Sequence, residues 1–212
     1  MSVDDLRSAG PDSDAADWGA PTGARPAKSS ARRRQAPEGM SQLDQLIAYE
    51  EIRQLANRYA LAVNLRDFDS LVELFIDDVR VGPGRSGREA LREVFLGHTT
   101  DSDVDILEVT THVINLVDED HATGTVYSRC EMGSVDRWAR QSIAYEDLYE
   151  RRDGLWFFVY RNHLLFYGVD VPERPLDQAP ANWPASPVGR GSVPYDWPSW
   201  QSERQGRRSR PE

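Results

Sequence analysis

Residues 105–120 read DILEVTTHVINLVDED. Apolar and β-branched residues alternate with polar ones along this run, which is the two-residue period of a strand with one buried face. In residues 42–64, by contrast, apolar residues recur at the three- and four-residue spacing of an amphipathic helix. The change of period at about residue 105 therefore divides the chain into a helical part followed by a sheet.

Three helices are expected before the change of period. They are predicted at residues 42–64, 67–77 and 87–98. Asp67 or Asp69 is expected to cap the second helix, because a carboxylate there can accept from free backbone N–H groups. Residues 77–82 (DDVRVG) are predicted to form a short strand, and the turn GPGRSG follows them.

Three more strands are expected after the first one. They are predicted at residues 124–135, 140–152 and 155–168. The sequence RRDG joins the last two strands as a tight hairpin. Helices followed by long antiparallel strands are typical of an α+β fold, in which a curved sheet carries helices on one face.

The two ends of the chain differ in composition from the middle. Residues 1–39 and 201–212 are polar and charged, so both are predicted to be disordered, and a start of translation at Met40 stays open. Residues 170–200 combine prolines with three tryptophans and are expected to form an arm that packs on the domain or on a second subunit. This leaves residues 40–169 as the folded domain.

The charge of the predicted domain argues against polyanionic partners. The chain has a formal net charge of −10; residues 1–39 are neutral and residues 200–212 carry +2, so residues 40–199 carry −12. An acidic domain repels nucleic acid and anionic lipid. No run of residues approaches the ~20 apolar residues of a membrane span. We therefore expect neither a nucleic-acid partner nor a membrane.

Cysteine, lysine and histidine usage excludes several further classes of site. Cys130 is the only cysteine, so no internal disulfide can form. The N-terminus does not resemble a signal peptide. For these two reasons a cytoplasmic location is expected. Lys28, in the predicted tail, is the only lysine, which excludes Schiff-base chemistry in the domain. The histidines have no metal-binding spacing and no nucleotide-binding glycine motif is present, so neither a metal nor a cofactor is expected.

Five short motifs occur in order along the chain. They are YxxAVNxRDFDxLxxLFxDDV from Tyr59, GREAL from Gly87, THVIN from Thr111, ATGTVY from Ala122 and YERRDGLWFF from Tyr149. In order and spacing they resemble the SnoaL-like branch of the nuclear-transport-factor-2-like superfamily, over roughly residues 42–168. The resemblance implies a cone, in which a bent antiparallel sheet surrounds a pocket that the first helix closes.

The resemblance also implies candidate catalytic residues. Tyr59 and His112 match the tyrosine and histidine of the dehydratase branch, whereas Asn64 stands where that branch has an aspartate. An amide cannot act as a base, although it can donate a hydrogen bond to an oxyanion. Three possibilities stay open: His112 is the sole acid/base group, another carboxylate has replaced the aspartate, or the protein binds a ligand without catalysis.

Alternation along the strands suggests which side chains share the pocket. His112 has the same parity as Thr110, Ile114 and Leu116, which is the pattern of an inward face. The third strand places Tyr145, Asp147 and Tyr149 on one side. In the fourth strand, Arg161 and His163 share a side with Phe157 and Val159.

If those sides face the pocket, Asp147 is the candidate replacement carboxylate, with Arg161 or His163 as its partner. Tyr145, Arg161 and His163 are then expected to bind substrate. The alternatives are a surface ion pair between Asp147 and Arg161, and a subunit contact for His163.

The sequence predicts a cofactor-independent lyase, isomerase or cyclase that moves a proton on a small hydrophobic metabolite bearing a carbonyl or hydroxyl group, such as a polyketide, steroid or terpenoid. His112 would move the proton, with Tyr59 and Asn64 holding the oxyanion. The alternative is a non-catalytic module with the same fold, either a ligand sensor or a subunit like the β subunit of a ring-hydroxylating dioxygenase. A homodimer is expected in either case.

Overall fold

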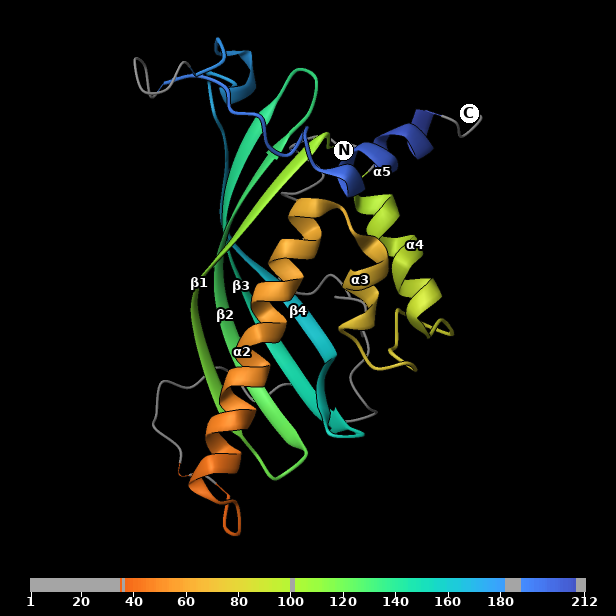
Figure 1. Ribbon diagram of the computed structural model, residues 1–212, viewed down its shortest axis with the longest axis vertical. Helices are drawn as coiled ribbons and strands as arrows, with labels where there is room; N and C mark the ends of the chain where they lie inside the picture. The colour runs from red at the N-terminus through yellow and green to blue at the C-terminus, as the bar shows by residue number, and fades with distance from the viewer. Residues whose placement is uncertain (1–34, 36, 100–101, 182–187, 209–212) are drawn as a thin grey trace.

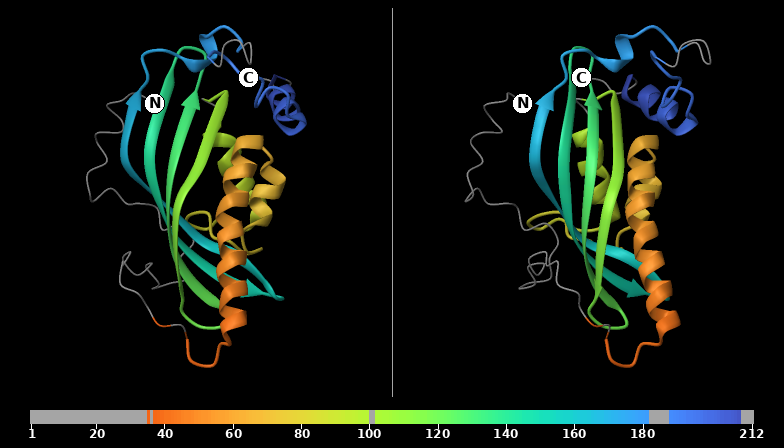
Figure 2. Two further views of the ribbon diagram at one scale, coloured as in Figure 1. Left: turned by 60° about the vertical axis from the view of Figure 1, so that its left-hand side comes forward. Right: turned by 90° about the vertical axis from the view of Figure 1, so that its left-hand side faces the viewer.

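The computed structural model describes residues 35, 37–99, 102–181 and 188–208. The tail predicted over residues 1–39 lies almost wholly outside this set. Helices α2, α3 and α4 precede four strands, and a 3₁₀ turn η1 and helix α5 follow them (Figure 1). The predicted α+β fold is confirmed: the three N-terminal helices lie on one side of a curved antiparallel sheet (Figure 2).

The first helix, α2, spans Gln42–Leu65. It begins after Ser41, whose hydroxyl accepts a hydrogen bond from the Asp44 N–H at 3.1 Å, and it ends at Arg66, which adopts left-handed dihedrals (φ 55°). Its buried face combines small alanines with larger side chains, so the helix lies close to the sheet. These residues are Ala48, Ile52, Leu55, Ala56, Tyr59, Ala60 and Ala62.

The segment after α2 differs from the prediction in two places. Helix α3 covers only Phe68–Glu73, with Asp67 as its N-cap, rather than residues 67–77. The chain leaves the helix because Phe75 forms a parallel bridge with Phe158, where Ile76 N–H donates to the Phe158 carbonyl at 3.0 Å. The strand expected at residues 77–82 is likewise only an isolated bridge between Arg80 and Ser86. Helix α4, Arg88–His98, lies where it was predicted.

The sheet has the strand order β1-β2-β3-β4, and every neighbouring pair is antiparallel. The strands are β1 Val104–Leu116, β2 His121–Gly133, β3 Trp138–Arg152 and β4 Leu155–Asp170. Asp153 and Gly154 both adopt positive φ in the turn between β3 and β4, as expected for a tight hairpin. No helix in the described part of the chain is long and apolar enough to cross a membrane.

A β-bulge in β1 decides which of its side chains face the helices. The register with β2 shifts between Val109 and Thr111, so Thr110 is an extra residue, and it is exposed. Leu107 and Val109 point into the core before the bulge, and His112 does so after it. The predicted inward face was therefore wrong for Thr110, because a bulge reverses the alternation of the strand.

A second bulge has the same effect in β4. Leu148 pairs with Tyr160 and Tyr149 pairs with Phe158, so Val159 is the extra residue. Arg161 therefore shares the concave face with Phe158, rather than with Phe157 as simple alternation predicted. This shift brings Arg161 opposite Asp147 on the helix side of the sheet.

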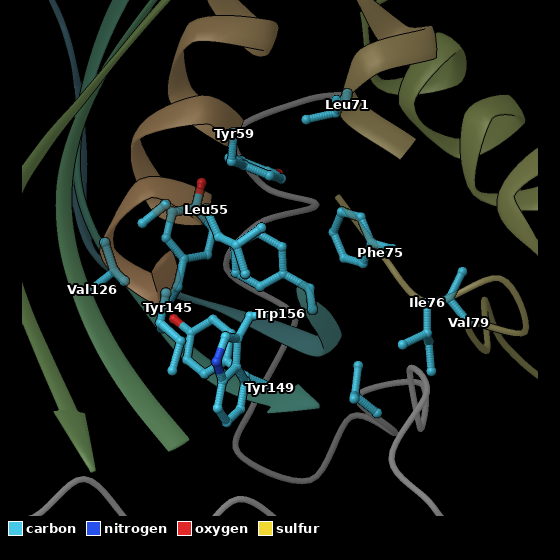
Figure 3. Close-up of a cluster of buried hydrophobic side chains, with 14 of the residues drawn as sticks. Leu55, Tyr59, Leu71, Phe75, Ile76, Val79, Val126, Tyr145, Tyr149 and Trp156 are labelled. Atoms are coloured by element: carbon cyan, nitrogen blue, oxygen red, sulfur yellow. The ribbon is translucent and has the colours of Figure 1, made fainter. Parts of the chain in front are cut away.

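The main core lies between α2, α3, α4 and the concave face of the sheet (Figure 3). Aromatic rings fill its centre: Tyr59 meets Phe75, Tyr145 and Phe158 edge to face, with centroids 6.4, 5.9 and 6.0 Å apart. Trp156 closes the core at the end of the β3–β4 hairpin, with 4% of its surface exposed. Such ring pairs contribute beyond the apolar area that they bury.

The C-terminal arm forms a second small core against the domain. Trp200 lies in helix α5, Pro198–Arg208, and packs with Val104 and Trp138 at one end of the sheet. Its indole N–H donates to the Asp103 carbonyl at 3.2 Å. The helix continues through residues that composition predicted to be disordered from 201 onward, because burial of Trp200 and an ion pair from Glu203 hold it on the domain.

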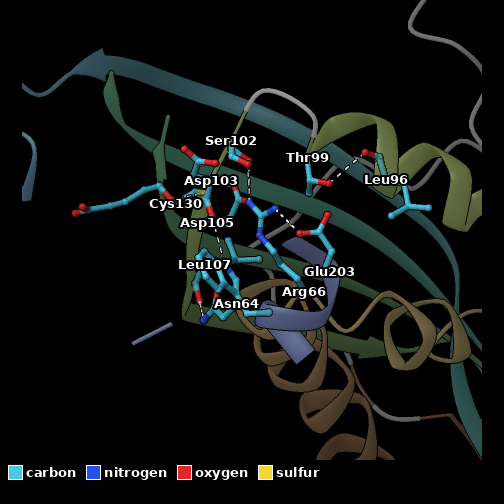
Figure 4. A network of polar contacts seen from close by, with 12 residues as sticks. Asn64, Arg66, Leu96, Thr99, Ser102, Asp103, Asp105, Leu107, Cys130 and Glu203 are labelled. Atoms are coloured by element: carbon cyan, nitrogen blue, oxygen red, sulfur yellow. Dashed lines mark hydrogen bonds and ion pairs between the residues drawn. The ribbon is translucent and has the colours of Figure 1, made fainter. Parts of the chain in front are cut away.

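The ion pair between the arm and the domain centres on Arg66 (Figure 4). The guanidinium group contacts Asp105 at 2.9 Å, Glu203 at 3.0 Å and the Ser102 carbonyl at 2.8 Å, and only 2% of the side chain is exposed. Burial raises the pKa of Asp105, which the charge of Arg66 opposes. One side chain therefore joins the end of α2, the start of β1 and α5.

We predict that Trp200→Ala lowers the free energy of unfolding by about 3–5 kcal/mol, because the substitution leaves a cavity in the small core. Urea denaturation measures the loss. The control is Val188→Ala in the same arm, where 71% of the side chain is exposed and almost no change is expected. Equal stabilities for the two variants would contradict docking of the arm on this domain.

Candidate functional site

The register of the four strands places polar side chains in adjacent rows on the concave face. Each row takes one residue from each strand in the order β1 to β4. The two central rows are His112, Val126, Tyr145, His163 and Ile114, Gly124, Asp147, Arg161, and the next is Leu116, Ala122, Tyr149, Phe158. His112, Asp147 and Arg161, which lie up to 49 positions apart in the sequence, are thus brought to one face.

A chain of polar contacts crosses the sheet from β1 to β4. His112 Nε2 lies 3.0 Å from the Tyr149 hydroxyl oxygen, and this hydroxyl donates to Asp147 Oδ2 at 2.8 Å. Asp147 Oδ1 lies 3.3 Å from Arg161 Nε, as an ion pair without hydrogen-bond geometry. The predicted pairing of Asp147 with Arg161 therefore occurs inside the domain rather than on its outer surface.

Arg161 is a buried cation surrounded by aromatic rings. Its side chain is 4% exposed, and that of Asp147 is 0% exposed. The guanidinium carbon lies 4.0 Å from the ring centroid of Tyr145, 4.2 Å from that of Tyr59 and 4.6 Å from that of Phe158. Ring faces attract a cation, and a desolvated contact of this kind is stronger than an exposed one.

Several buried polar atoms around Arg161 lack a hydrogen-bond partner within the described structure. They are His112 Nδ1, Ser128 Oγ, Asp147 Oδ1, Arg161 Nε and Arg161 Nη1. Buried polar atoms in proteins are nearly always paired, and an unpaired one requires an explanation. Because several of them lie on one face of the sheet, we treat this face as the candidate site.

His112 and Asp147 have opposite pKa shifts. Burial, reinforced by the charges of Arg161 and Arg53, lowers the pKa of His112 to about 4. Burial raises the pKa of Asp147 to about 6, although Arg161 and the Tyr149 hydroxyl favour its charged form. At neutral pH the site therefore holds a neutral imidazole, an ionised carboxylate and a guanidinium cation.

The two tyrosines predicted for the site both contact Arg161. Tyr59 comes from α2 and Tyr145 from β3, and both are buried (Figure 3). Burial raises the pKa of each phenol, so both keep their protons at neutral pH and can act as donors.

His163 lies at the edge of the site, where the concave face meets solvent. It is exposed, and its ring centroid is 5.6 Å from that of Tyr145. Leu165, the next residue of β4 on this face, is 49% exposed. This end of β4 is therefore open to solvent.

The side chain of Asn64 is bonded to the backbone of β1. Its amide nitrogen donates to the Leu107 carbonyl at 3.1 Å, and its amide oxygen accepts from the Leu107 N–H at 2.6 Å (Figure 4). Both polar ends of the side chain are therefore used to tie α2 to β1. These bonds leave only the second N–H of the amide for an oxyanion, so a role of Asn64 in catalysis stays a prediction.

Neither Tyr149 nor Ser128 was predicted from the sequence to have a role in the site. The signal for Tyr149 was present, since it shares a strand face with Asp147 two residues before it. Ser128 lies on the inward face of β2, but a single serine in a strand has no sequence feature that marks it as functional.

A cavity of about 550 Å³ lies elsewhere, between the β2–β3 turn and the segment after β4. It is lined by Asp136, Arg137, Trp138, Asp170, Val171, Pro172, Glu173, Arg174, Asp177 and Gln178, none of which belongs to the polar chain. Among the residues that the structure describes, no group of three or more His, Cys, Asp or Glu side chains is arranged to hold a metal ion.

Comparison with known proteins gives a family and a set of structural neighbours. A family model for the SnoaL-like domain matches residues 44–162. A comparison with curated proteins gave no match.

Three solved structures illustrate the likeness of the fold. A hexachlorocyclohexane dehydrochlorinase, LinA-type3 from Novosphingobium barchaimii, is 24% identical, with a TM-score of 0.56 over 62% of this chain and 95% of its own. A candidate scytalone dehydratase from Novosphingobium aromaticivorans is 18% identical, with a TM-score of 0.55 over 63% and 94%. A singly substituted form of Rv3472 from Mycobacterium tuberculosis, described as of unknown function, is 23% identical, with a TM-score of 0.51 over 80% and 95%.

We predict that Asn64→Asp destabilises the protein by about 1–3 kcal/mol at neutral pH, because a carboxylate cannot donate to the Leu107 carbonyl and leaves it unpaired. The measurement is the midpoint of urea unfolding. Asn57→Asp, on the exposed side of the same helix, is the matched control and should change stability little. If both variants unfold at the same urea concentration, the tie between Asn64 and Leu107 is not important for stability.

Proposed function

This chain belongs to the SnoaL-like domain family, and on that premise we propose that it is a cofactor-independent lyase, isomerase or cyclase. Its substrate would be a small hydrophobic metabolite that bears a carbonyl or hydroxyl group, such as a polyketide, steroid or terpenoid. The observation that carries the proposal is the buried chain His112–Tyr149–Asp147–Arg161, in which His112 Nδ1 has no partner among the described residues. The printed names of two structural neighbours, a dehydrochlorinase and a candidate dehydratase, also describe eliminations.

His112 has the properties of a base in this proposal. Its lowered pKa, about 4, keeps the imidazole unprotonated at neutral pH, and Nδ1 is the nitrogen that is free to take a proton. An imidazole with so low a pKa is a weak base, so the substrate must be made more acidic. The reaction therefore depends on a second group that stabilises the negative charge which develops when the proton leaves.

Arg161 supplies that charge stabilisation. Its Nη1 atom is buried and has no hydrogen-bond partner in the described part of the chain, and the aromatic rings around it keep water away. A fixed cation in a site of low dielectric stabilises an enolate or a departing anion more strongly than the same cation in water. The phenols of Tyr59 and Tyr145 border Arg161 and are hydrogen-bonded to each other, so one of the two hydroxyl protons is available to the same oxygen.

We predict that the protein exchanges the acidic C–H protons of a bound ketone for deuterium, and that His112→Ala slows this exchange by about 10²–10⁴-fold, the usual contribution of a general base. Mass spectrometry after incubation in D₂O with enolisable ketones and enones measures the exchange. His121→Ala is the matched control, because His121 is exposed and its side chain is bonded to Asp118 in the turn before β2, away from the site.

Two outcomes would contradict this function. Exchange that persists unchanged in His112→Ala would remove His112 from the mechanism. Ligands that bind but never exchange would favour the second candidate function, a ligand-binding module. Asn64 favours that candidate, because it stands where the dehydratase branch has an aspartate. Its amide is instead bonded to the backbone of Leu107.

We also propose a homodimer formed through the convex face of the sheet. Tyr127, Leu164, Phe166 and Tyr167 gather on this face, with exposed fractions of 44, 41, 62 and 54%. A contiguous apolar patch of this kind is typical of a contact surface. Among the described residues, none of the helices covers it, because they lie on the opposite side of the sheet (Figure 2).

Phe166→Glu is expected to shift the protein from dimer to monomer, because a charge in the centre of the contact would lose its water. Light scattering after size exclusion gives the mass. Val135→Glu, in the β2–β3 turn where the side chain is 80% exposed, should leave the dimer intact. A wild-type protein that is already monomeric would exclude this dimer.

A further inference from the structure

The contact between His112 and Tyr149 passes over a strand. His112 lies on β1 and Tyr149 on β3, and β2 runs between them. The β2 residue at this point is Gly124, which pairs with Ile114 on one side and Asp147 on the other. A Cβ atom at Gly124 would lie 2.8 Å from the Tyr149 hydroxyl oxygen and 3.1 Å from His112 Nε2.

A glycine is needed at position 124 because a side chain there would not fit, and not because the backbone requires an unusual conformation. It is not among the described glycines with positive φ, so any residue could adopt its backbone conformation. Contacts below 3.0 Å to a Cβ atom require a neighbour to move. Tyr149 Cε2 and its hydroxyl oxygen, both at 2.8 Å, would be pushed away from His112 by any larger residue.

The directions of the hydrogen bonds fix the proton on His112. A tyrosine hydroxyl has one proton to donate, and an ionised carboxylate can only accept. The Tyr149 proton is therefore committed to Asp147 Oδ2, and the hydroxyl oxygen can only accept from His112 Nε2. The imidazole must then carry its proton on Nε2, which leaves the lone pair on Nδ1.

We propose that Tyr149 is a positioning residue that ties the tautomer of His112 to the charge of Asp147, with Gly124 as the gap in β2 through which the contact is made. The inference rests on the proposed function in one respect, namely that Nδ1 is the atom that takes the substrate proton. Neither the order of the bonds nor the tautomer depends on what the substrate is.

Protonation of Asp147 reverses the chain. The carboxyl group takes one proton from solvent and becomes a donor to the Tyr149 oxygen, so the tyrosine proton turns toward His112 Nε2. The imidazole stays neutral, because Nε2 releases its proton to solvent while Nδ1 takes one proton up from solvent. The site has then bound one proton in total, and Nδ1 no longer has a lone pair for the substrate.

The burial of the two groups opens a pH range in which this reversal is observable. The pKa of Asp147 is about 6 and that of His112 is about 4, so between these values the carboxyl group is protonated while the imidazole is still neutral. The other titratable groups that act on the pair are Tyr59 and Arg53 from α2, Tyr145 from β3 and Arg161 from β4. Arg161 lowers the pKa of both His112 and Asp147, so it shifts the pH range between the two values downward and does not remove it.

The test follows the ring nitrogens of His112 by NMR in the full chain labelled with ¹⁵N-histidine, without any substrate. The two nitrogens of a neutral imidazole have distinct resonances according to which one carries the proton. We expect the proton on Nε2 at pH 8 and on Nδ1 at pH 5. In Tyr149→Phe the dependence on pH should be lost, because the link to Asp147 is broken.

Two further variants sharpen the experiment. Gly124→Ala should lose the switch as Tyr149→Phe does, and Tyr149→Phe decides the matter if Gly124→Ala fails to fold. Tyr127→Phe, on the convex face, is the matched control and should keep the switch.

Two results would overturn the inference: a proton on Nδ1 already at pH 8, or a switch that survives in Tyr149→Phe. These spectra are separable from the test of the proposed function. Deuterium exchange that requires His112 but not Tyr149 would leave the function standing and remove the role of Tyr149. A tautomer switch without any exchange would leave the switch standing and remove the function.

Discussion

A guanidinium group buried at the centre of the concave face is the constraint on which the rest of the site depends. An uncompensated charge in this environment is very unfavourable, and the removal of one partner from a buried pair typically costs about 3–5 kcal/mol. Asp147 supplies the opposite charge, and three aromatic rings supply favourable quadrupole contacts. Burial raises the pKa of Asp147, whereas Arg161 and the hydrogen bond from Tyr149 both favour its charged form.

The geometry around this charge depends on irregularities in the strands. The bulge at Thr110 turns His112 inward, and the bulge at Val159 turns Arg161 toward Asp147. Without the bulge at Thr110, His112 would point to the convex face, and without the bulge at Val159, Arg161 would do so. The side chain would then contact water in place of Tyr149 or Asp147. Bulges next to active sites commonly redirect a side chain in this way.

The helix side of the site is held in place by polar contacts that take no part in the proposed chemistry. Asn64 joins α2 to the backbone of β1, and Arg66 joins both to α5. An asparagine in place of an acid at this position therefore has a structural explanation: an amide, unlike an ionised carboxylate, can both donate to and accept from the backbone of Leu107. Asp147 on β3, which the sequence offered as a replacement for that acid, is buried beside Arg161 and Tyr149.

The sequence by itself determined the α+β class, the order of helices and strands, the family, and the choice of His112, Asp147 and Arg161 as candidates. These follow from hydrophobic period and short motifs, which are local properties of the chain. Only the tertiary structure decided that α3 stops at Glu73, that Asn64 binds Leu107, and that Tyr149 links His112 to Asp147 past Gly124. All of these features depend on which residues become neighbours across the sheet. The sequence of a single strand does not contain that information.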